Sequence, residues 1–168
     1  MSAGNVSLEL LEQERDAEDV FELTEELDYG ISKQIIQTIY PSPQAIIGRV
    51  KNNSEIVSIA KVSNKIVGFA SVLLSPYEKA LASISLCGVK EKFQRKKIGK
   101  SLIELLLNKC KVIGVNKITC MIPSENTEGL IFLIRCGLKP FVYFFDAYSL
   151  RQDGILMFRY LQTNGGRI

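Results

Sequence analysis

The segment from residue 80 to residue 114 constrains the fold most, because a strand there runs through a basic turn into an amphipathic helix. Residues 80–89 are mostly apolar and predict a strand. From Ile98 onward, apolar residues recur with the period of a helix, and polar residues occupy the opposite stripe until Gly114. A helix with one broad apolar face must pack against another layer, and we expect that layer to be a sheet.

Further strands and helices are predicted on both sides of this segment. Alternation predicts a short strand at 6–10, and the Ser63-Asn64 turn between two apolar runs predicts a hairpin. The predicted strands are 6–10, 56–62, 65–74, 80–89, 117–122, 141–148 and 155–161, with an Asp153-Gly154 turn before the last. The predicted helices are 17–27, 32–40, 98–114 and 127–136, and residues 44–50 form a turn or a further helix. This β-α-α-β-β-β-α-β-α-β-β order predicts an α/β fold with helices on both faces of a mixed sheet.

Length and composition predict one globular domain over residues 1–168. The chain is 46% hydrophobic and 23% charged, the balance of a protein with a packed core. Arg135 interrupts the longest apolar run, so no segment reaches the roughly 18 to 20 residues that span a bilayer. The N-terminus lacks the pattern of a signal peptide, and Ser2 stands where N-myristoylation requires a glycine. We therefore expect a cytoplasmic protein that does not bind membranes.

The chain has no histidine and only four cysteines. Histidine acid–base catalysis is excluded, so proton transfer must use carboxylates, Tyr, Cys, Lys or water. The cysteines form no CxxC pair and predict reduced core thiols: Cys87, Cys110, Cys120 and Cys136. With no histidine and scattered thiols, no metal site is expected.

Charge is distributed unevenly along the chain. Residues 1–28 hold ten acidic residues and one basic residue, a net charge of −9. Residues 90–100 hold six basic residues and one acidic residue, a net charge of +5. This pattern is consistent with an anion site at one place and an acidic wall at another, or with two solvated faces.

The basic cluster lies where the strand 80–89 meets the helix that begins at Ile98. The first N–H groups of a helix lack partners within the helix, and the helix dipole adds about half a positive charge, so such a junction favours phosphate. Gly99 permits close approach of the backbone. The segment from Gln94 to Lys100 therefore predicts a phosphate-binding loop.

This junction resembles the pyrophosphate signature of the GNAT (Gcn5-related N-acetyltransferase) superfamily, Gln/Arg-x-x-Gly-x-Gly/Ala. Gln94 and Gly99 match the signature, whereas Lys97 stands at its first glycine. The resemblance continues in Asn126, which is followed eleven residues later by Gly137. It implies a single-domain GNAT-like fold with a mixed, mostly antiparallel sheet.

The resemblance also implies a site for acetyl-CoA. In the superfamily the pantetheine arm binds main-chain groups of the strand before the loop, where a bulge splays that strand from the next parallel one. The implied cofactor-binding residues are Cys87, Gly88, Val89, Gln94, Arg95, Lys96, Lys97, Ile98, Gly99, Lys100 and Asn126. Asn126 is also a preferred helix N-cap, and the two roles are compatible. For Cys87 a nucleophilic role and a packing role are the alternatives.

The acid–base residues stay open under this resemblance. Leu133 stands where many members have a tyrosine that protonates the departing thiolate, and Ser83 stands where relatives place a carboxylate on the strand. A water relay past Ser83 and Ser85 is the first hypothesis for the base. The acidic alternatives are Glu25, Glu26 and Asp28. Tyr143 or Tyr148 could supply the acid, or both could serve the strands that contain them.

The resemblance implies an acetyl-CoA-dependent N-acetyltransferase in which a primary amine attacks the thioester directly in a ternary complex. The acidic N-terminal region favours a cationic acceptor, such as a polyamine, a lysine side chain or a peptide N-terminus. The alternative, indicated by Leu133 and Ser83, is a catalytically silent acyl-CoA-binding or sensor module. Nucleic acid is not an expected partner, because no aromatic platform beyond Phe93 accompanies the basic patch. Relatives often dimerise through C-terminal strands, which makes a homodimer an expectation.

Overall fold

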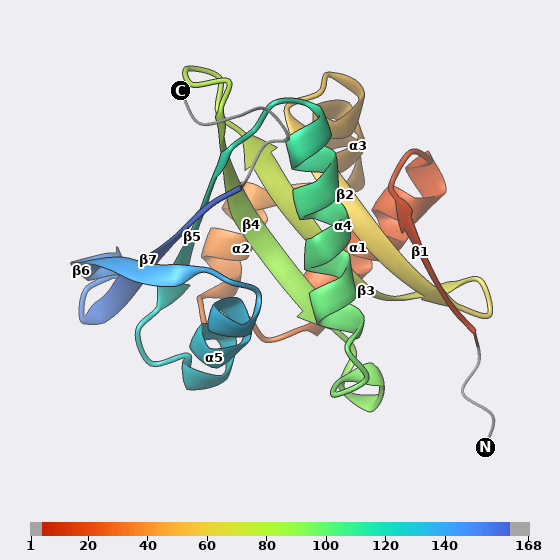
Figure 1. Ribbon diagram of the computed structural model, residues 1–168. Helices are drawn as coiled ribbons and strands as arrows, with labels where there is room; N and C mark the ends of the chain where they lie inside the picture. Colours follow the sequence, from red (N-terminus) through yellow and green to blue (C-terminus); the bar gives the residue numbers. More distant parts are fainter. Residues whose placement is uncertain (1–4, 162–168) are drawn as a thin grey trace.

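The computed structural model describes residues 5–161, which form a seven-stranded sheet with helices on both faces (Figure 1). The strands are β1 (Val6–Leu10), β2 (Glu55–Val62), β3 (Lys65–Leu74), β4 (Leu81–Val89), β5 (Lys117–Pro123), β6 (Lys139–Ser149) and β7 (Gln152–Tyr160). Their order in the sheet is β1-β2-β3-β4-β5-β7-β6. Neighbouring strands are antiparallel except β4 and β5, which are parallel. The predicted mixed, mostly antiparallel sheet is therefore confirmed.

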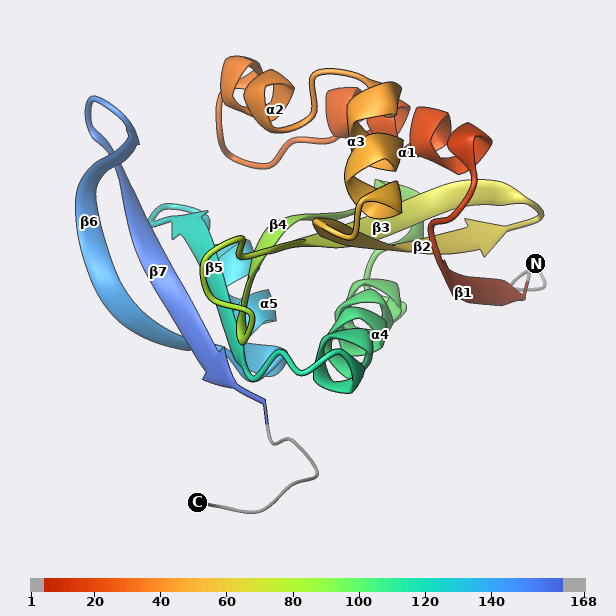
Figure 2. The same cartoon turned by 90° about the horizontal axis from the view of Figure 1, so that it is seen from above.

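The helices divide between the two faces of the sheet, as Figure 2 shows. They are α1 (Glu14–Glu26), α2 (Lys33–Ile39), α3 (Pro43–Lys51), α4 (Ile98–Val112) and α5 (Thr127–Arg135), with a short 3-10 helix η1 (Glu91–Phe93) before α4. Helices α1, α2 and α3 cover one face and enclose one apolar core, and α4 and α5 cover the other face and its core. Within residues 5–161, none of the helices combines the length and the apolar character that crossing a bilayer requires.

Local sequence signals explain where several elements begin and turn. Residues 44–50 belong to helix α3, which begins at Pro43. Ser42 is its N-cap, and the Ser42 hydroxyl accepts a hydrogen bond from the N–H of Ala45. Ser63 and Asn64 both have positive φ, +51° and +61°, as the two central residues of a tight hairpin turn require. The predicted hairpin of β2 and β3 is therefore confirmed.

Strand β4 pairs with β5 over only its first half. Their parallel register ends at Ile84 opposite Cys120. The next residue, Ser85, is an extra residue in β4, a β-bulge at which the register with β3 shifts. Beyond it, β5 continues to pair with β7 on its other side. The edge of residues 85–89 that faces β5 consequently has no strand partner.

One predicted turn is wrong. The β6–β7 hairpin turns at Leu150-Arg151, and Asp153-Gly154 lies inside β7. Gly154 suits close packing there, since a Cβ on it would lie 2.7 Å from the Cβ of Ala147. The Asp153 carboxylate accepts a hydrogen bond from the Tyr143 hydroxyl in β6. Cross-strand contacts thus account for a dipeptide that in isolation is typical of a turn.

Candidate functional site

A pocket of about 570 Å³ opens beside the unpaired edge of β4. Its walls come from the end of β4, the η1 loop, the beginning of α4 and helix α5. Ten of the eleven predicted cofactor-binding residues line it: Cys87, Gly88, Val89, Gln94, Arg95, Lys97, Ile98, Gly99, Lys100 and Asn126. The fold therefore gathers one contiguous motif and one distant asparagine around a single cavity.

Lys96 is the predicted residue that does not line the pocket. Its ammonium donates a hydrogen bond to the carbonyl of Lys92, at 3.1 Å, and lies 5.4 Å from the centroid of the Phe93 ring. Because these contacts hold the side chain against η1, its contribution to the pocket is limited to its charge.

The loop before α4 presents backbone N–H groups to the pocket. Lys97 is the N-cap of α4 with a left-handed φ of +65°, and its side chain caps no N–H group of the helix. The N–H groups of the first turn, at Ile98, Gly99 and Lys100, have no partner within the helix. The side-chain amide of Gln94 donates a hydrogen bond to the carbonyl of Val89 at 2.9 Å, which ties the loop to β4. This arrangement favours an anion such as phosphate.

An exposed ion pair joins the loop to helix α5. The guanidinium of Arg95 lies 3.0 Å from the carboxylate of Glu128, and both residues line the pocket. Exposed pairs contribute at most about 1 kcal/mol, so a bound anion can compete for Arg95.

Asn126 serves both roles that the sequence allowed. It is the N-cap of α5, with its side-chain oxygen accepting the N–H of Gly129 at 2.9 Å, and it also lines the pocket. Its side-chain nitrogen lies 3.6 Å from the place that a Cβ on Gly30 would occupy, so the α1–α2 loop reaches this side of the pocket.

Cys87 and Leu133 do not supply reactive groups. Burial, together with the neighbouring Cys136 and Cys120, raises the pKa of the Cys87 thiol above its usual range, which disfavours the nucleophilic thiolate. Leu133, on α5, is 4% exposed and packs in the core that α4 and the sheet share. No phenol therefore occupies the position at which the resemblance implies the family's acid.

The four predicted catalytic residues lie on three different elements. Ser83 and Ser85 lie on β4, Glu26 ends α1, and Tyr143 lies on β6. Among residues 5–161, no hydrogen bond or ion pair joins any two of these four residues. The structure therefore does not assemble them into one catalytic group.

Two of the four are paired with charged side chains. The Glu26 carboxylate lies 2.8 Å from the ammonium of Lys90, which neutralises its charge. The Tyr143 hydroxyl donates a 2.5 Å hydrogen bond to Asp153, and this bond raises the pKa of the exposed tyrosine. Tyr143 is thereby a weaker acid than an unpaired tyrosine.

Sequence reasoning missed Tyr29, which lies next to the cofactor strand. A Cβ on Gly88 would lie 3.1 Å from the Tyr29 hydroxyl and 2.5 Å from Leu27, so the α1–α2 loop packs directly over Gly88. Burial, followed by the neighbouring Cys87, Tyr40 and Glu26, raises the pKa of Tyr29. No local pattern marks this tyrosine, because its position depends on how the loop folds over β4.

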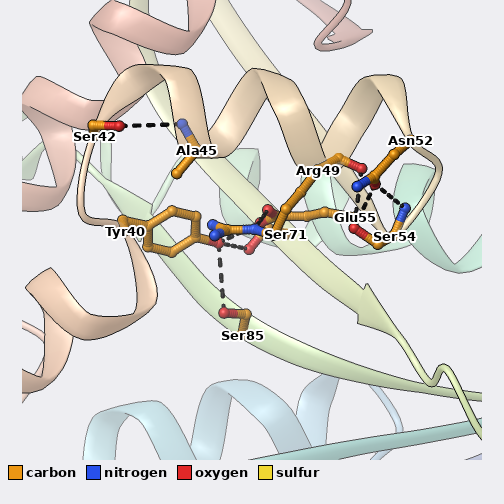
Figure 3. A network of polar contacts seen from close by, with 9 residues as sticks. All are labelled: Tyr40, Ser42, Ala45, Arg49, Asn52, Ser54, Glu55, Ser71 and Ser85. Atoms are coloured by element: carbon orange, nitrogen blue, oxygen red, sulfur yellow. Dashed lines mark hydrogen bonds and ion pairs between the residues drawn. The ribbon is translucent and has the colours of Figure 1, made fainter.

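Sequence reasoning also missed a buried polar cluster that reaches Ser85 from the α3 side of the sheet (Figure 3). The Tyr40 hydroxyl donates to the carboxylate of Glu55 at 2.6 Å, and the Ser85 hydroxyl lies 3.5 Å from the same phenol oxygen. Arg49 pairs with Glu55 at 2.7 Å. The cluster places a carboxylate behind the β-bulge of the cofactor strand.

Two neighbouring parallel strands separate here, beside the N-terminus of a helix that favours an anion. This architecture is typical of a coenzyme A-dependent acyltransferase. Residues 13–138 match the family model described as the acetyltransferase (GNAT) family, and the chain belongs to this family. It is accordingly an acetyl-CoA-dependent acyltransferase. None of the curated proteins compared with the chain matches it significantly.

Solved structures of low sequence identity share this fold. The ribosomal-protein-S18-alanine N-acetyltransferase of Escherichia coli superposes with a TM-score of 0.75 at 15% identity, covering 98% of this chain and 99% of its own. The PaiA N-acetyltransferase of Thermoplasma acidophilum, solved in complex with coenzyme A, gives 0.73 at 18% identity, covering 92% and 99%. Ard1 of Thermoplasma volcanium gives 0.69 at 21% identity, covering 94% and 98%.

The pocket residues fit acetyl-CoA. The unpaired edge of residues 85–89 offers backbone donors and acceptors that suit the amides of a pantetheine arm. The N–H groups at the start of α4, with Arg95, Lys97 and Lys100, suit its phosphates. When bound, acetyl-CoA supplies an acyl carbon activated as a thioester.

Proposed function

We propose that this protein is an N-acetyltransferase that transfers the acetyl group of acetyl-CoA to a primary amine: a polyamine, a lysine side chain or a peptide N-terminus. The observation that carries the proposal is the unpaired edge of β4 beside the basic loop, covered on its other side by Tyr29 and the α1–α2 loop. The amine nitrogen attacks the thioester directly in a ternary complex. Burial raises the pKa of the Cys87 thiol, which disfavours a thiolate nucleophile and supports direct transfer without a covalent enzyme intermediate.

The acceptor side of the site is bounded by two loops that contact each other. The side-chain amide of Gln152, at the β6–β7 turn, donates a 2.8 Å hydrogen bond to the carbonyl of Gly30 in the α1–α2 loop. Figure 2 shows the β6–β7 hairpin rising beside α2. A slender acceptor such as an alkyl amine or an extended peptide end suits such a bridged site.

The acidic end of α1 favours a cationic acceptor. Glu26 is paired with Lys90, the Asp28 carboxylate accepts the N–H of Gly30, and the Lys33 ammonium donates to the backbone carbonyl of Glu25 rather than to its carboxylate. Reversing all three charges should raise the KM for a cationic amine and leave acetyl-CoA affinity unchanged. An unchanged KM would contradict a cationic acceptor.

Thermal unfolding with acetyl-CoA, followed by thiol release, tests the function. At about 100 times its dissociation constant, acetyl-CoA should stabilise the fold by about 2.7 kcal/mol, a shift of roughly 5 to 11 °C. ATP and acetate are the controls for nonspecific anions. Thiol release is then measured with spermidine, Nα-acetyl-lysine amide and an alanine-starting peptide, and turnover with at least one of them supports the proposal.

The alternative that the sequence left open is a catalytically silent acyl-CoA sensor. It is favoured by the buried Leu133 and by Ser83, which replace a catalytic tyrosine and carboxylate of the family. A sensor would show the thermal shift but release no thiol with any of the three amines.

We also propose a homodimer in the cytoplasm. The edge strand β6 exposes large apolar side chains, among them Phe141 and Phe145 at 70% and 82%, and the four cysteines are free thiols. Sedimentation of the wild type and of a Phe145→Ser variant tests the dimer, which the substitution should weaken.

A further inference from the structure

The buried cluster behind Ser85 contains a carboxylate that solvent does not reach. The Glu55 side chain on β2 is fully buried, and Tyr40 is likewise 0% exposed. A buried carboxylate is tolerated only when it is paired and hydrogen-bonded, and here Arg49 and Tyr40 supply those contacts. Figure 3 shows the residues converging on the phenol oxygen of Tyr40.

The hydrogen bonds of this cluster have a direction. Tyr40 has one hydroxyl hydrogen, and the carboxylate of Glu55 can only accept, so Tyr40 donates to Glu55 at 2.6 Å. The lone pairs of the phenol oxygen then face two serine hydroxyls, Ser71 on β3 and Ser85 on β4. A continuous chain of hydroxyl groups thus leads from β4 to a carboxylate.

The open end of this chain lies at the bulge of the cofactor strand, next to the residues that line the pocket. Ser85 is the β-bulge residue at which β4 separates from β5, two residues before Cys87 in the cofactor pocket. Ser71 lies on β3 and is fully buried, whereas Ser85 is only half-buried. One branch of the cluster therefore ends at the half-buried bulge beside the pocket, and the other ends in the core.

A purely structural cluster would be expected to satisfy all of its polar atoms. Arg49 Nη2 is buried and has no hydrogen-bond partner among residues 5–161, so the cluster keeps a spare donor beside the carboxylate. The contact that holds the carboxylate is made by Arg49 Nε, at 2.7 Å.

We infer that Glu55 is the proton acceptor for the attacking amine, acting through Tyr40 and Ser85 as positioning residues. This inference rests on the proposed N-acetyltransferase function. The ammonium proton of the acceptor passes to Ser85 Oγ, directly or through one water, and the electron pair of the broken N–H bond stays on nitrogen. The Ser85 proton moves to Tyr40, the Tyr40 proton moves to Glu55, and Glu55 becomes a neutral carboxylic acid. After the products leave, the same path in reverse returns the proton to solvent.

Isosteric substitutions cut this relay at separate points. Tyr40→Phe removes the phenol oxygen and Glu55→Gln removes the base, whereas Ser71→Ala, the matched control, removes the branch that leads away from the site. Acetyl-CoA affinity and the unfolding temperature, measured for all three variants, verify that each folds and binds. Infrared difference spectra without acetyl-CoA locate the Glu55 carboxylate band, which Tyr40→Phe should shift and Ser71→Ala should leave unchanged.

The pH profile distinguishes a proton relay from a structural role. The titratable or charged groups that face Tyr40 are Glu55 from β2, Arg49 from α3 and Tyr29 from the α1–α2 loop. With whichever of spermidine, Nα-acetyl-lysine amide and the alanine-starting peptide turns over, Tyr40→Phe and Glu55→Gln should lower kcat at pH 7 by about 10²-fold or more. The loss should shrink as pH approaches the pKa of the amine, because free amine needs no base. Ser71→Ala should keep the wild-type profile.

Two outcomes overturn the inference, and they differ from failure of the proposed function. If the wild type turns over and both relay variants keep its rate, or lose rate equally at every pH, the relay is wrong and the function stands. If the wild type binds acetyl-CoA but releases thiol with none of the three amines, the proposed function fails and the relay fails with it.

Discussion

Lys97 adopts a backbone conformation for which the GNAT signature normally provides a glycine. Its φ is +65°, in the left-handed region, at the N-cap of α4. That region costs an L-residue about 1–2 kcal/mol, whereas glycine avoids this cost but loses roughly 0.5–1 kcal/mol more conformational entropy on folding. Lys97→Gly should therefore be more stable than Lys97→Ala by about 0.5–1 kcal/mol, or about 1–4 °C in Tm for a chain of this length.

The two variants also separate strain from charge, because both lose the ammonium and only the glycine loses the strain. Lys97 is exposed and lines the pocket, so its contribution to phosphate binding is screened and should not exceed about 1 kcal/mol, or ~5-fold in Kd. Calorimetric titration with acetyl-CoA should show the same weakening in both variants, diminishing at high salt. Equal Tm values for the two variants would refute the strain argument, and an unchanged Kd in both would refute a contact between Lys97 and the phosphates.

Three further predictions concern the α1–α2 loop, the pocket mouth and the core thiols. Gly88→Ala places a Cβ 2.5 Å from the Leu27 side chain and should destabilise the fold by about 1–3 kcal/mol in urea unfolding, with loss of activity. The control Gly48→Ala, on α3 with open space around it, should be neutral or stabilising. Glu128→Gln frees Arg95 and should tighten acetyl-CoA binding a few-fold in calorimetric titration; weaker binding would contradict competition for Arg95. Burial raises the pKa of the Cys110 thiol to about 11, so the unfolded chain, with an ordinary thiol pKa of about 8.5, releases this proton first as pH rises. The free energy of unfolding should fall from about pH 8.5 toward pH 11, and Cys110→Ala should reduce that slope; identical slopes would contradict the shift.

The fold was predictable because its main elements depend on local periodicity. The apolar face from Ile98, the Ser63-Asn64 turn and the N-caps Ser32 and Asn126 are encoded within a few residues, and the structure confirms them. The turn predicted at Asp153-Gly154 is wrong because contacts with β6, a separate strand, determine the conformation of this dipeptide. Tertiary contact, rather than local propensity, decided that position.

The cofactor side of the site was accessible to sequence reasoning for a related reason. Its loop is one continuous segment, Gln94 to Lys100, whose conformation at a strand–helix junction creates the anion site. The acceptor side is assembled from loops distant in sequence. Tyr29 and Gln152 meet the site only because the α1–α2 loop and the β6–β7 hairpin fold toward each other.

The acid–base problem is harder, because this chain lacks the strand carboxylate and the helix tyrosine at the positions that the family uses. Two carboxylates are buried among residues 5–161, Asp16 and Glu55. Asp16 pairs with Lys61 on β2, near the β1 edge of the sheet, and neither residue lines the pocket. Glu55, in contrast, connects through Tyr40 to the bulge in β4. A module that only binds acyl-CoA gains nothing from a buried carboxylate linked to the cofactor strand, since burying that charge is costly. An amine acetyltransferase with serine at position 83 needs a proton acceptor, and Glu55 is the buried carboxylate whose hydrogen bonds lead to the site.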